Sequence, residues 1–177
     1  LVEFDNKEYL YYKAIAPDIA FIRATTCDSE GYATFEDEVM YLDALVIAQA
    51  VHNNGGIVMM QVQKMVKKAT LHPKSVRIPG YLVDIVVFDP DQSQLYGGAP
   101  VNRFISGDFT LDDSIKLSLP LNQRKLVARR ALFEMRKGAV GNVGVGIADG
   151  IGLVAREVGC ADDFILTVET GPIGGIT

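Results

Sequence analysis

Two segments of this sequence alternate short apolar runs with helical patterns, and this alternation constrains the fold more than any other feature. In the first segment, the strand-like residues 18–25 and the apolar run 57–62 flank residues 36–56, whose apolar spacing is helical. Acidic residues in the first turn of that helix suit its dipole, and the Asn and Gly residues at its end supply a stop. A short apolar run such as 57–62 is typical of a parallel strand that is buried on both faces. Strand, helix and strand in this order predict an α/β fold with a parallel sheet.

The same pattern returns near the end of the sequence. Residues 122–138 have the spacing of an amphipathic helix that ends at Gly138, and they precede a strand over 139–146, a helix over roughly 149–158 and a strand over 164–169. A right-handed crossover makes the two strands parallel, so their carboxyl ends emerge on the same edge of the sheet. In open α/β sheets, ligands bind at that edge.

The stretch between these two segments has a different texture. Residues 89–120 are rich in proline and show little periodicity, which predicts a domain linker or an excursion. We therefore expect residues 1–88 to belong to one domain and residues 121–177 to the start of another. Within the first of these, we also expect a hairpin that turns at Asp5-Asn6-Lys7 and a buried strand over 81–88.

A carboxylate stands at the end of the last predicted strand. Glu169 leaves that strand at the edge where the loop Gly144-Val145-Gly146-Ile147 leaves the other strand of the unit. Glycine-rich loops let backbone amides approach a ligand closely and favour negative charge. With such amides nearby, Glu169 could act as a general base, as a salt-bridge partner or as a nucleophile that forms a covalent acyl intermediate. The plain alternative is that Glu169 caps the strand and pairs with an arginine.

Composition narrows the classes of partner and location. The net charge is −5, no basic tract is present, and no apolar stretch approaches the ~20 residues that span a bilayer. We therefore expect a soluble, cytoplasmic protein with neither nucleic acid nor membranes as partners. The four residues Cys27, Cys160, His52 and His72 are too few and too scattered for a metal site, and we expect both cysteines to be small buried hydrophobes. Both ends of the sequence have the character of an interior piece of a longer polypeptide.

Four stretches of the sequence resemble the family I coenzyme A (CoA) transferases, in the acetate/propionate CoA-transferase branch. They are LHPKSVRIPGYLVDIVV (71–87), NQRKLVARRALFEMRKGAVGNVGVGIADGI (122–151), GCADD (159–163) and TVETGPIGG (167–175). The resemblance implies two homologous open α/β (Rossmann-like) domains. Residues 1–88 would be the later part of the first, 89–120 the linker or excursion, and 121–177 the opening of the second.

The resemblance also implies a reaction. Glu169 would attack an acyl-CoA, and the resulting anhydride would be opened by the CoA thiolate to give a glutamyl-CoA thioester, from which a second carboxylate takes CoA by ping-pong kinetics. Gly144, Val145, Gly146 and Gly171 would lie in loops near the oxyanion or CoA. The implied partners are acyl-CoA, short carboxylic acids such as acetate, and the remainder of the same polypeptide. A homotetramer is expected, with no metal and no cofactor beyond the substrate CoA.

Two alternatives stay open at this point. The piece could be an inactive fragment or binding segment of such an enzyme. The run GNVGVGIADG could instead indicate a nicotinamide-dependent oxidoreductase, although Asp149 fills the third glycine position of that fingerprint and Gly150 comes one residue late. We interpret the other conspicuous basic groups as solvated, locally hydrogen-bonded or domain-interface residues rather than as ligands; they are His72, Lys64, Lys67, Lys68, Arg124, Lys125, Arg129 and Arg130.

Overall fold

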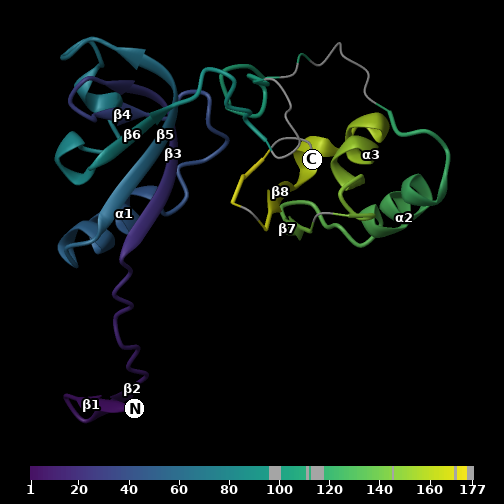
Figure 1. Cartoon of the computed structure of the whole chain (residues 1–177). Helices are drawn as coiled ribbons and strands as arrows, with labels where there is room; N and C mark the ends of the chain where they lie inside the picture. The colour runs from purple at the N-terminus through teal and green to yellow at the C-terminus, as the bar shows by residue number, and fades with distance from the viewer. Residues whose placement is uncertain (96–100, 111, 113–117, 145, 170, 175–177) are drawn as a thin grey trace. The chain divides into compact units, whose positions relative to one another are not determined.

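The chain divides into two compact units, Leu1–Phe109 and Thr110–Thr177. The computed structural model describes every residue except 96–100, 111, 113–117, 145, 170 and 175–177 (Figure 1). The boundary between the units falls inside residues 89–120, the stretch whose texture predicted a linker. Among the described residues, no helix combines the length and the apolar character that crossing a bilayer requires.

The first unit is built on a four-stranded sheet with the order β4-β3-β5-β6 (Figure 1). β3, β5 and β6 are parallel, and β4 pairs with β3 in the antiparallel sense. The strands are β3 (Ile19–Asp28), β4 (Ala33–Thr34), β5 (Ile57–Val66) and β6 (Ile85–Phe88), with helix α1 (Ala44–Asn53) between β4 and β5 and short 3₁₀ turns at Pro73–Ser75 and Gly80–Leu82. The predicted order of strand, helix and strand is confirmed. The strand expected over 81–88 starts only at Ile85, because the 3₁₀ turn occupies the preceding residues.

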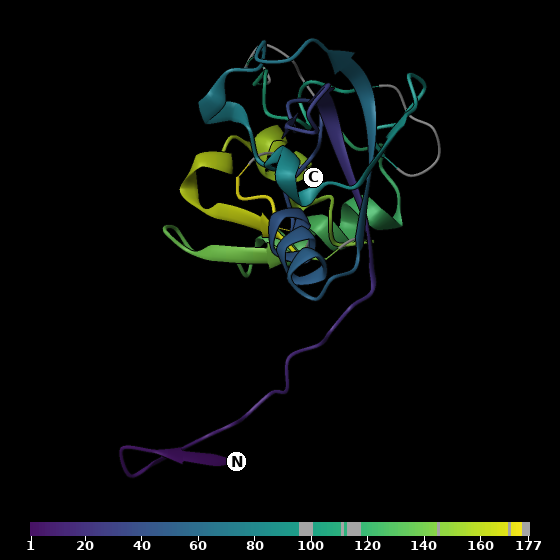
Figure 2. The same ribbon diagram turned by 60° about the vertical axis from the view of Figure 1, so that its left-hand side comes forward.

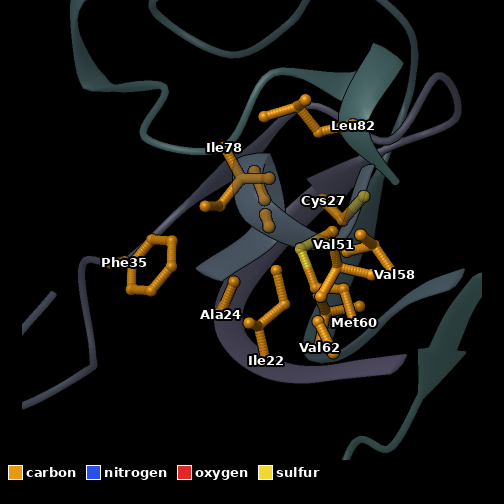
Figure 3. Packing of buried hydrophobic residues seen from close by; sticks show 13 residues of the cluster. Ile22, Ala24, Cys27, Phe35, Val51, Val58, Met60, Val62, Ile78 and Leu82 are labelled. Atoms are coloured by element: carbon orange, nitrogen blue, oxygen red, sulfur yellow. The ribbon is translucent and has the colours of Figure 1, made fainter. Parts of the chain in front are cut away.

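One face of this sheet carries the core of the unit. Side chains from alternate positions of β3 and β5 meet those of α1, and Val51, Val58, Met60 and Val62 are fully buried (Figure 3). The intervening side chains point the other way, and Phe21 is 78% exposed. The prediction that residues 57–62 are buried on both faces is therefore wrong for the described residues, since α1 packs against one face only.

Helix α1 begins eight residues later than its predicted start at Glu36, and its first turn holds no acidic residue. The acidic residues expected in that turn instead form ion pairs with side chains of the sheet. Glu38 accepts hydrogen bonds of 2.9 and 2.7 Å from the Arg23 guanidinium, and Asp37 lies 2.5 Å from the Lys64 ammonium. These ion pairs with cations on β3 and β5 place the acids where they cannot cap a helix. Lys64 is therefore paired within the unit, with about half of its side chain still exposed to solvent.

The N-terminal residues form the expected hairpin. β1 (Val2–Phe4) and β2 (Lys7–Tyr9) are antiparallel, and Figure 2 shows them with the strand-free stretch that follows. Asp5 and Asn6 have φ values of 50° and 58°, the left-handed conformation that a two-residue turn of this kind requires. Lys7, which the sequence placed in the turn, belongs to β2.

The second unit contains the predicted pair of parallel strands. β7 (Val140–Val143) pairs in parallel with β8 (Ile165–Val168), from Val140 opposite Ile165 to Val143 opposite Val168. Helices α2 (Gln123–Leu132) and α3 (Ile151–Val158) contribute Ala128, Val154 and Ala155 to its buried cluster, and a 3₁₀ turn at Ala161–Asp163 precedes β8. α2 ends six residues before Gly138; that glycine, with φ of 79°, instead closes the turn that follows and donates to the Asp163 carbonyl.

Cys27 is a buried thiol, as expected from the sequence. It has no exposed surface, and burial together with the neighbouring Asp28 carboxylate raises its pKa to about 11. Because the thiolate is the reactive form, we expect iodoacetamide at pH 8 to leave Cys27 unmodified in the native protein and to alkylate it after unfolding. Mass measurement of the peptide that contains Cys27 tests this. Equal labelling rates before and after unfolding would contradict it.

Candidate active site

Gly144 and Glu169 lie side by side at the carboxyl edge of the two-stranded sheet. Each is the residue that directly follows the last pair of the parallel ladder, Val143 and Val168. A Cβ atom built on Gly144 would lie 3.4 Å from Oε2 of Glu169, which is an ordinary van der Waals distance. The strand–helix–strand topology therefore brings the glycine-rich loop and the carboxylate together, as the sequence predicted from the crossover rule.

The chain reverses direction directly at Glu169. The Gly171 amide donates to the Val168 carbonyl at 2.9 Å, and the Val168 amide donates to the Pro172 carbonyl at 3.0 Å. Beyond this turn, Ile173 forms an antiparallel bridge with Thr167. Gly171 has φ of 118°, which few residues other than glycine adopt. Glu169 thus lies on a tight turn braced against its own strand, with an exposed side chain.

A side-chain hydrogen bond joins the two strands one residue pair before the end of the ladder. The Thr167 hydroxyl donates to the Asn142 side-chain oxygen at 3.0 Å, and the two residues are partners in the ladder. Side chains opposite each other on paired strands interact in this way and help to fix the register. The sequence analysis missed this pair, although a polar residue at the third position of both short apolar strands was a visible signal.

The rest of the loop is only partly described. Gly146 is exposed with φ of 147°, Asp149 donates its amide to the Gly146 carbonyl at 3.3 Å, and Val145 lies outside the described residues. Among the five predicted site residues, Gly144 thus lies next to the Glu169 carboxylate and Gly171 shapes its turn. The roles assigned to these residues stay predictions.

The cations of α2, which the sequence treated as equivalent, have different environments. Arg124 pairs with Asp149 at the end of the loop, and Arg130 forms an exposed pair with Glu134. Lys125 is only 8% exposed; its ammonium donates to the Leu119 carbonyl at 2.9 Å and to Glu157 at 2.5 Å. The interpretation of Lys125 as a surface charge or a domain-interface residue is therefore wrong, because its partners lie in its own unit.

His72 matches its local interpretation. Its Nδ1 accepts a hydrogen bond of 3.2 Å from the Lys74 amide, which caps a 3₁₀ turn. Lys68 is paired with Glu30 at 2.6 Å, and this carboxylate raises the pKa of Lys68. Neither residue belongs to the unit that contains Glu169.

The comparison with protein families decides the class of this protein. The family model described as "Coenzyme A transferase" matches residues 1–89, which is half of the chain. The chain belongs to the coenzyme A transferase family. The family resemblance stated from the sequence is confirmed, and the alternative of a nicotinamide-dependent enzyme has lost its support.

Relatives within the coenzyme A transferases match the whole chain. It is 98% identical over 177 residues to the acetate CoA-transferase YdiF of Escherichia coli O157:H7, of which it covers 33%. It is 41% identical to the caffeate CoA-transferase of Acetobacterium woodii, with 99% of this chain and 34% of that protein covered. The chain therefore spans about a third of the length of these curated relatives.

A solved coenzyme A transferase has the same fold. The crystal structure of the acyl-CoA transferase YdiF from E. coli O157:H7, a thioester complex with CoA, superposes with a TM-score of 0.85 and 95% sequence identity. The superposition covers 99% of this chain and 35% of that one. The α/β fold class inferred from the sequence is confirmed.

Proposed function

We propose that this protein transfers CoA from a short-chain acyl-CoA to a free carboxylate such as acetate, with Glu169 as the covalent nucleophile. The observation that carries the proposal is the position of Glu169, exposed on a braced turn with the glycine at 144 beside its carboxylate. The close relatives named as CoA-transferases and the thioester complex of one of them support the same chemistry.

Each half of the proposed reaction consists of two acyl-transfer steps. An oxygen of Glu169 attacks the acyl carbonyl carbon, and the carbon–sulfur bond breaks. The CoA thiolate departs, and the acyl group is now joined to Glu169 as a mixed anhydride. The thiolate then attacks the glutamyl carbonyl carbon, the anhydride carbon–oxygen bond breaks, and the free acid leaves as a carboxylate. A second carboxylate reverses these steps. Electrons and protons balance without a further cofactor, and the acid released in the first half leaves before the acceptor binds.

The loop residues would stabilise the charge that develops in these steps. Each attack places a negative charge on a carbonyl oxygen, and a preorganised amide donor at that point contributes on the order of a hundredfold in rate. Gly144 has no side chain to stand between its backbone and the carboxylate of Glu169, and its amide would be such a donor. The anhydride must also be kept from water, which would hydrolyse it.

The covalent intermediate gives a direct test. The full-length protein is incubated with acetyl-CoA and no acceptor, and its peptides are weighed by mass spectrometry. We expect a CoA adduct on the peptide that contains Glu169, and we expect added acetate to remove it. An adduct on another residue, or transfer that proceeds with no adduct at all, would contradict the proposal.

Gly144→Ala should slow the reaction without unfolding the protein. The added methyl group would be in contact with Oε2 of Glu169, at 3.4 Å, where the acyl group has to approach. We expect the thermal midpoint to change little, because the contact distance is ordinary. We expect kcat to fall on the order of tenfold, because small shifts of a reacting group are costly in rate. Val140→Ala, at the exposed opposite end of β7, is the control. Equal rates in the two variants would contradict the proposed place of Gly144.

Assembly and location are further proposals. From the family resemblance we propose a homotetramer in the cytoplasm that acts on acyl-CoA and short carboxylic acids. Light scattering on the full-length protein measures the number of subunits, and a monomer or dimer would exclude the tetramer.

A further inference from the structure

The loop between β7 and α3 needs an anchor from outside itself. It runs from Gly144 to Gly150 and contains three glycines, which lose more conformational freedom on ordering than other residues. At its start, the ladder with β8 holds Gly144 beside Glu169. A loop that has to present amides to a carboxylate must also be fixed at its other end.

That other end is held by the first turn of α2. The Arg124 guanidinium donates to Oδ1 of Asp149, and the two side chains are 45% and 21% exposed. The next residue, Gly150, is buried and lies so close to its neighbours that a Cβ atom there would be 2.6 Å from Leu119 Cδ1 and 3.3 Å from Ala128 Cβ. The ion pair of Asp149 and the close packing of the Gly150 backbone against Leu119 and Ala128 thus both fix the end of the loop.

We propose that Arg124 and Asp149 are positioning residues for the Glu169 nucleophile. The pair sets where the loop ends, and the ladder up to Val143 sets where it begins, so the described residues of the loop keep their place relative to the carboxylate. Neither residue needs to touch the substrate. This inference rests on the proposed function of Glu169. It assigns a role in that reaction to Arg124, which the sequence analysis interpreted as a surface or domain-interface residue, and to its partner Asp149.

The size of the effect follows from the geometry. Misplacement of a catalytic group by about 1 Å can cost on the order of a hundredfold in rate. Loss of one partly exposed pair, with the packing of Gly150 intact, should displace the loop less than this. We therefore expect a decrease of about tenfold in the rate of thioester formation.

The experiment compares two arginines of one helix in the full-length protein. Arg124→Met removes the anchor, Arg124→Lys keeps the charge, and Arg130→Met removes an exposed pair with Glu134 whose side chains are 69% and 71% exposed. Single-turnover thioester formation from acetyl-CoA, KM for acetyl-CoA, the thermal midpoint, and hydrogen exchange of peptides that cover residues 144–150 are measured for each variant.

Arg124→Met should form the thioester about tenfold more slowly, with KM within twofold of the wild type and a thermal midpoint close to that of Arg130→Met. Its loop peptides should exchange faster than those of Arg130→Met, and Arg124→Lys should recover at least part of the rate. An unchanged rate and unchanged exchange in Arg124→Met would overturn the proposal. So would a rate loss that follows a lower thermal midpoint and is not relieved by lysine. If the wild type forms no adduct on Glu169, the proposed function fails, and the exchange data still report separately whether Arg124 anchors the loop.

Discussion

Replacing Glu169 by alanine is expected to remove the CoA adduct and to reduce transfer by on the order of a thousandfold or more, because the nucleophile itself is lost. The turn around Glu169 is held by backbone hydrogen bonds of Val168, Gly171 and Pro172, which do not involve the Glu169 side chain. The variant should therefore fold normally. Initial rates of CoA exchange between acetyl-CoA and a second short acid measure the effect.

Glu169→Asp tests whether the position of the carboxylate matters as well as its presence. The aspartate carboxylate is one methylene shorter and would lie about 1 Å from its proper place, which should cost on the order of a hundredfold while the adduct still forms slowly. Glu134→Ala, an exposed glutamate of the same unit, is the control and should keep the normal rate. If Glu169→Ala still exchanged CoA at near the normal rate, Glu169 would instead be a residue that ends its strand and has no chemical role.

The second large effect concerns stability, at Gly80 in the first unit. A Cβ atom on Gly80 would lie 2.0 Å from the carbonyl oxygen of Glu30, and Gly31 packs on the other side of the same contact, with its own Cβ position 3.2 Å from the Gly80 Cα. The obstacle is backbone rather than a flexible side chain, so the turns around residues 30 and 80 would have to separate. We expect Gly80→Ala to lower the free energy of unfolding by on the order of 3 kcal/mol.

Gly55→Ala is the matched control for this change. Gly55 also lies in the first unit and has open space around it, so only its φ of 75° opposes a side chain. The expected loss is about 1 kcal/mol. Urea unfolding of both variants, followed in the full-length protein, compares the two values. A smaller loss for Gly80→Ala than for Gly55→Ala would show that the close approach of the two turns is not what requires glycine at position 80.

Topology was predictable from the sequence, whereas element ends were not. The alternation of apolar runs and helical spacing correctly predicted β7, α3 and β8, and the crossover rule predicted that Gly144 and Glu169 meet. The start of α1 was wrong because Asp37 and Glu38 bind Lys64 and Arg23 on the strands. Such ion pairs join positions far apart in the chain, and a local pattern of charges does not reveal them.

The candidate site was predictable to a similar extent. Its carboxylate and its neighbouring glycine followed from strand order, together with the family resemblance. The anchor of the loop did not, because Arg124 and Arg130 look alike in an amphipathic pattern and differ only in what faces them in the folded unit. The burial of Lys125 was missed for the same reason, since its partner Glu157 lies on another helix.

The strand pair that carries Glu169 also has a consequence for how the protein folds. Asn142 and Thr167 are 25 positions apart, and the loop, α3 and the turn after β8 all lie within or next to that interval. Contacts between residues that are close in sequence form faster than those that must close long loops. The nucleophile and its neighbouring glycine can therefore come together early. Their pairing does not have to wait for the central pair of the four-stranded sheet, β3 and β5, in which Ile19 pairs with Ile57 across a longer stretch of chain.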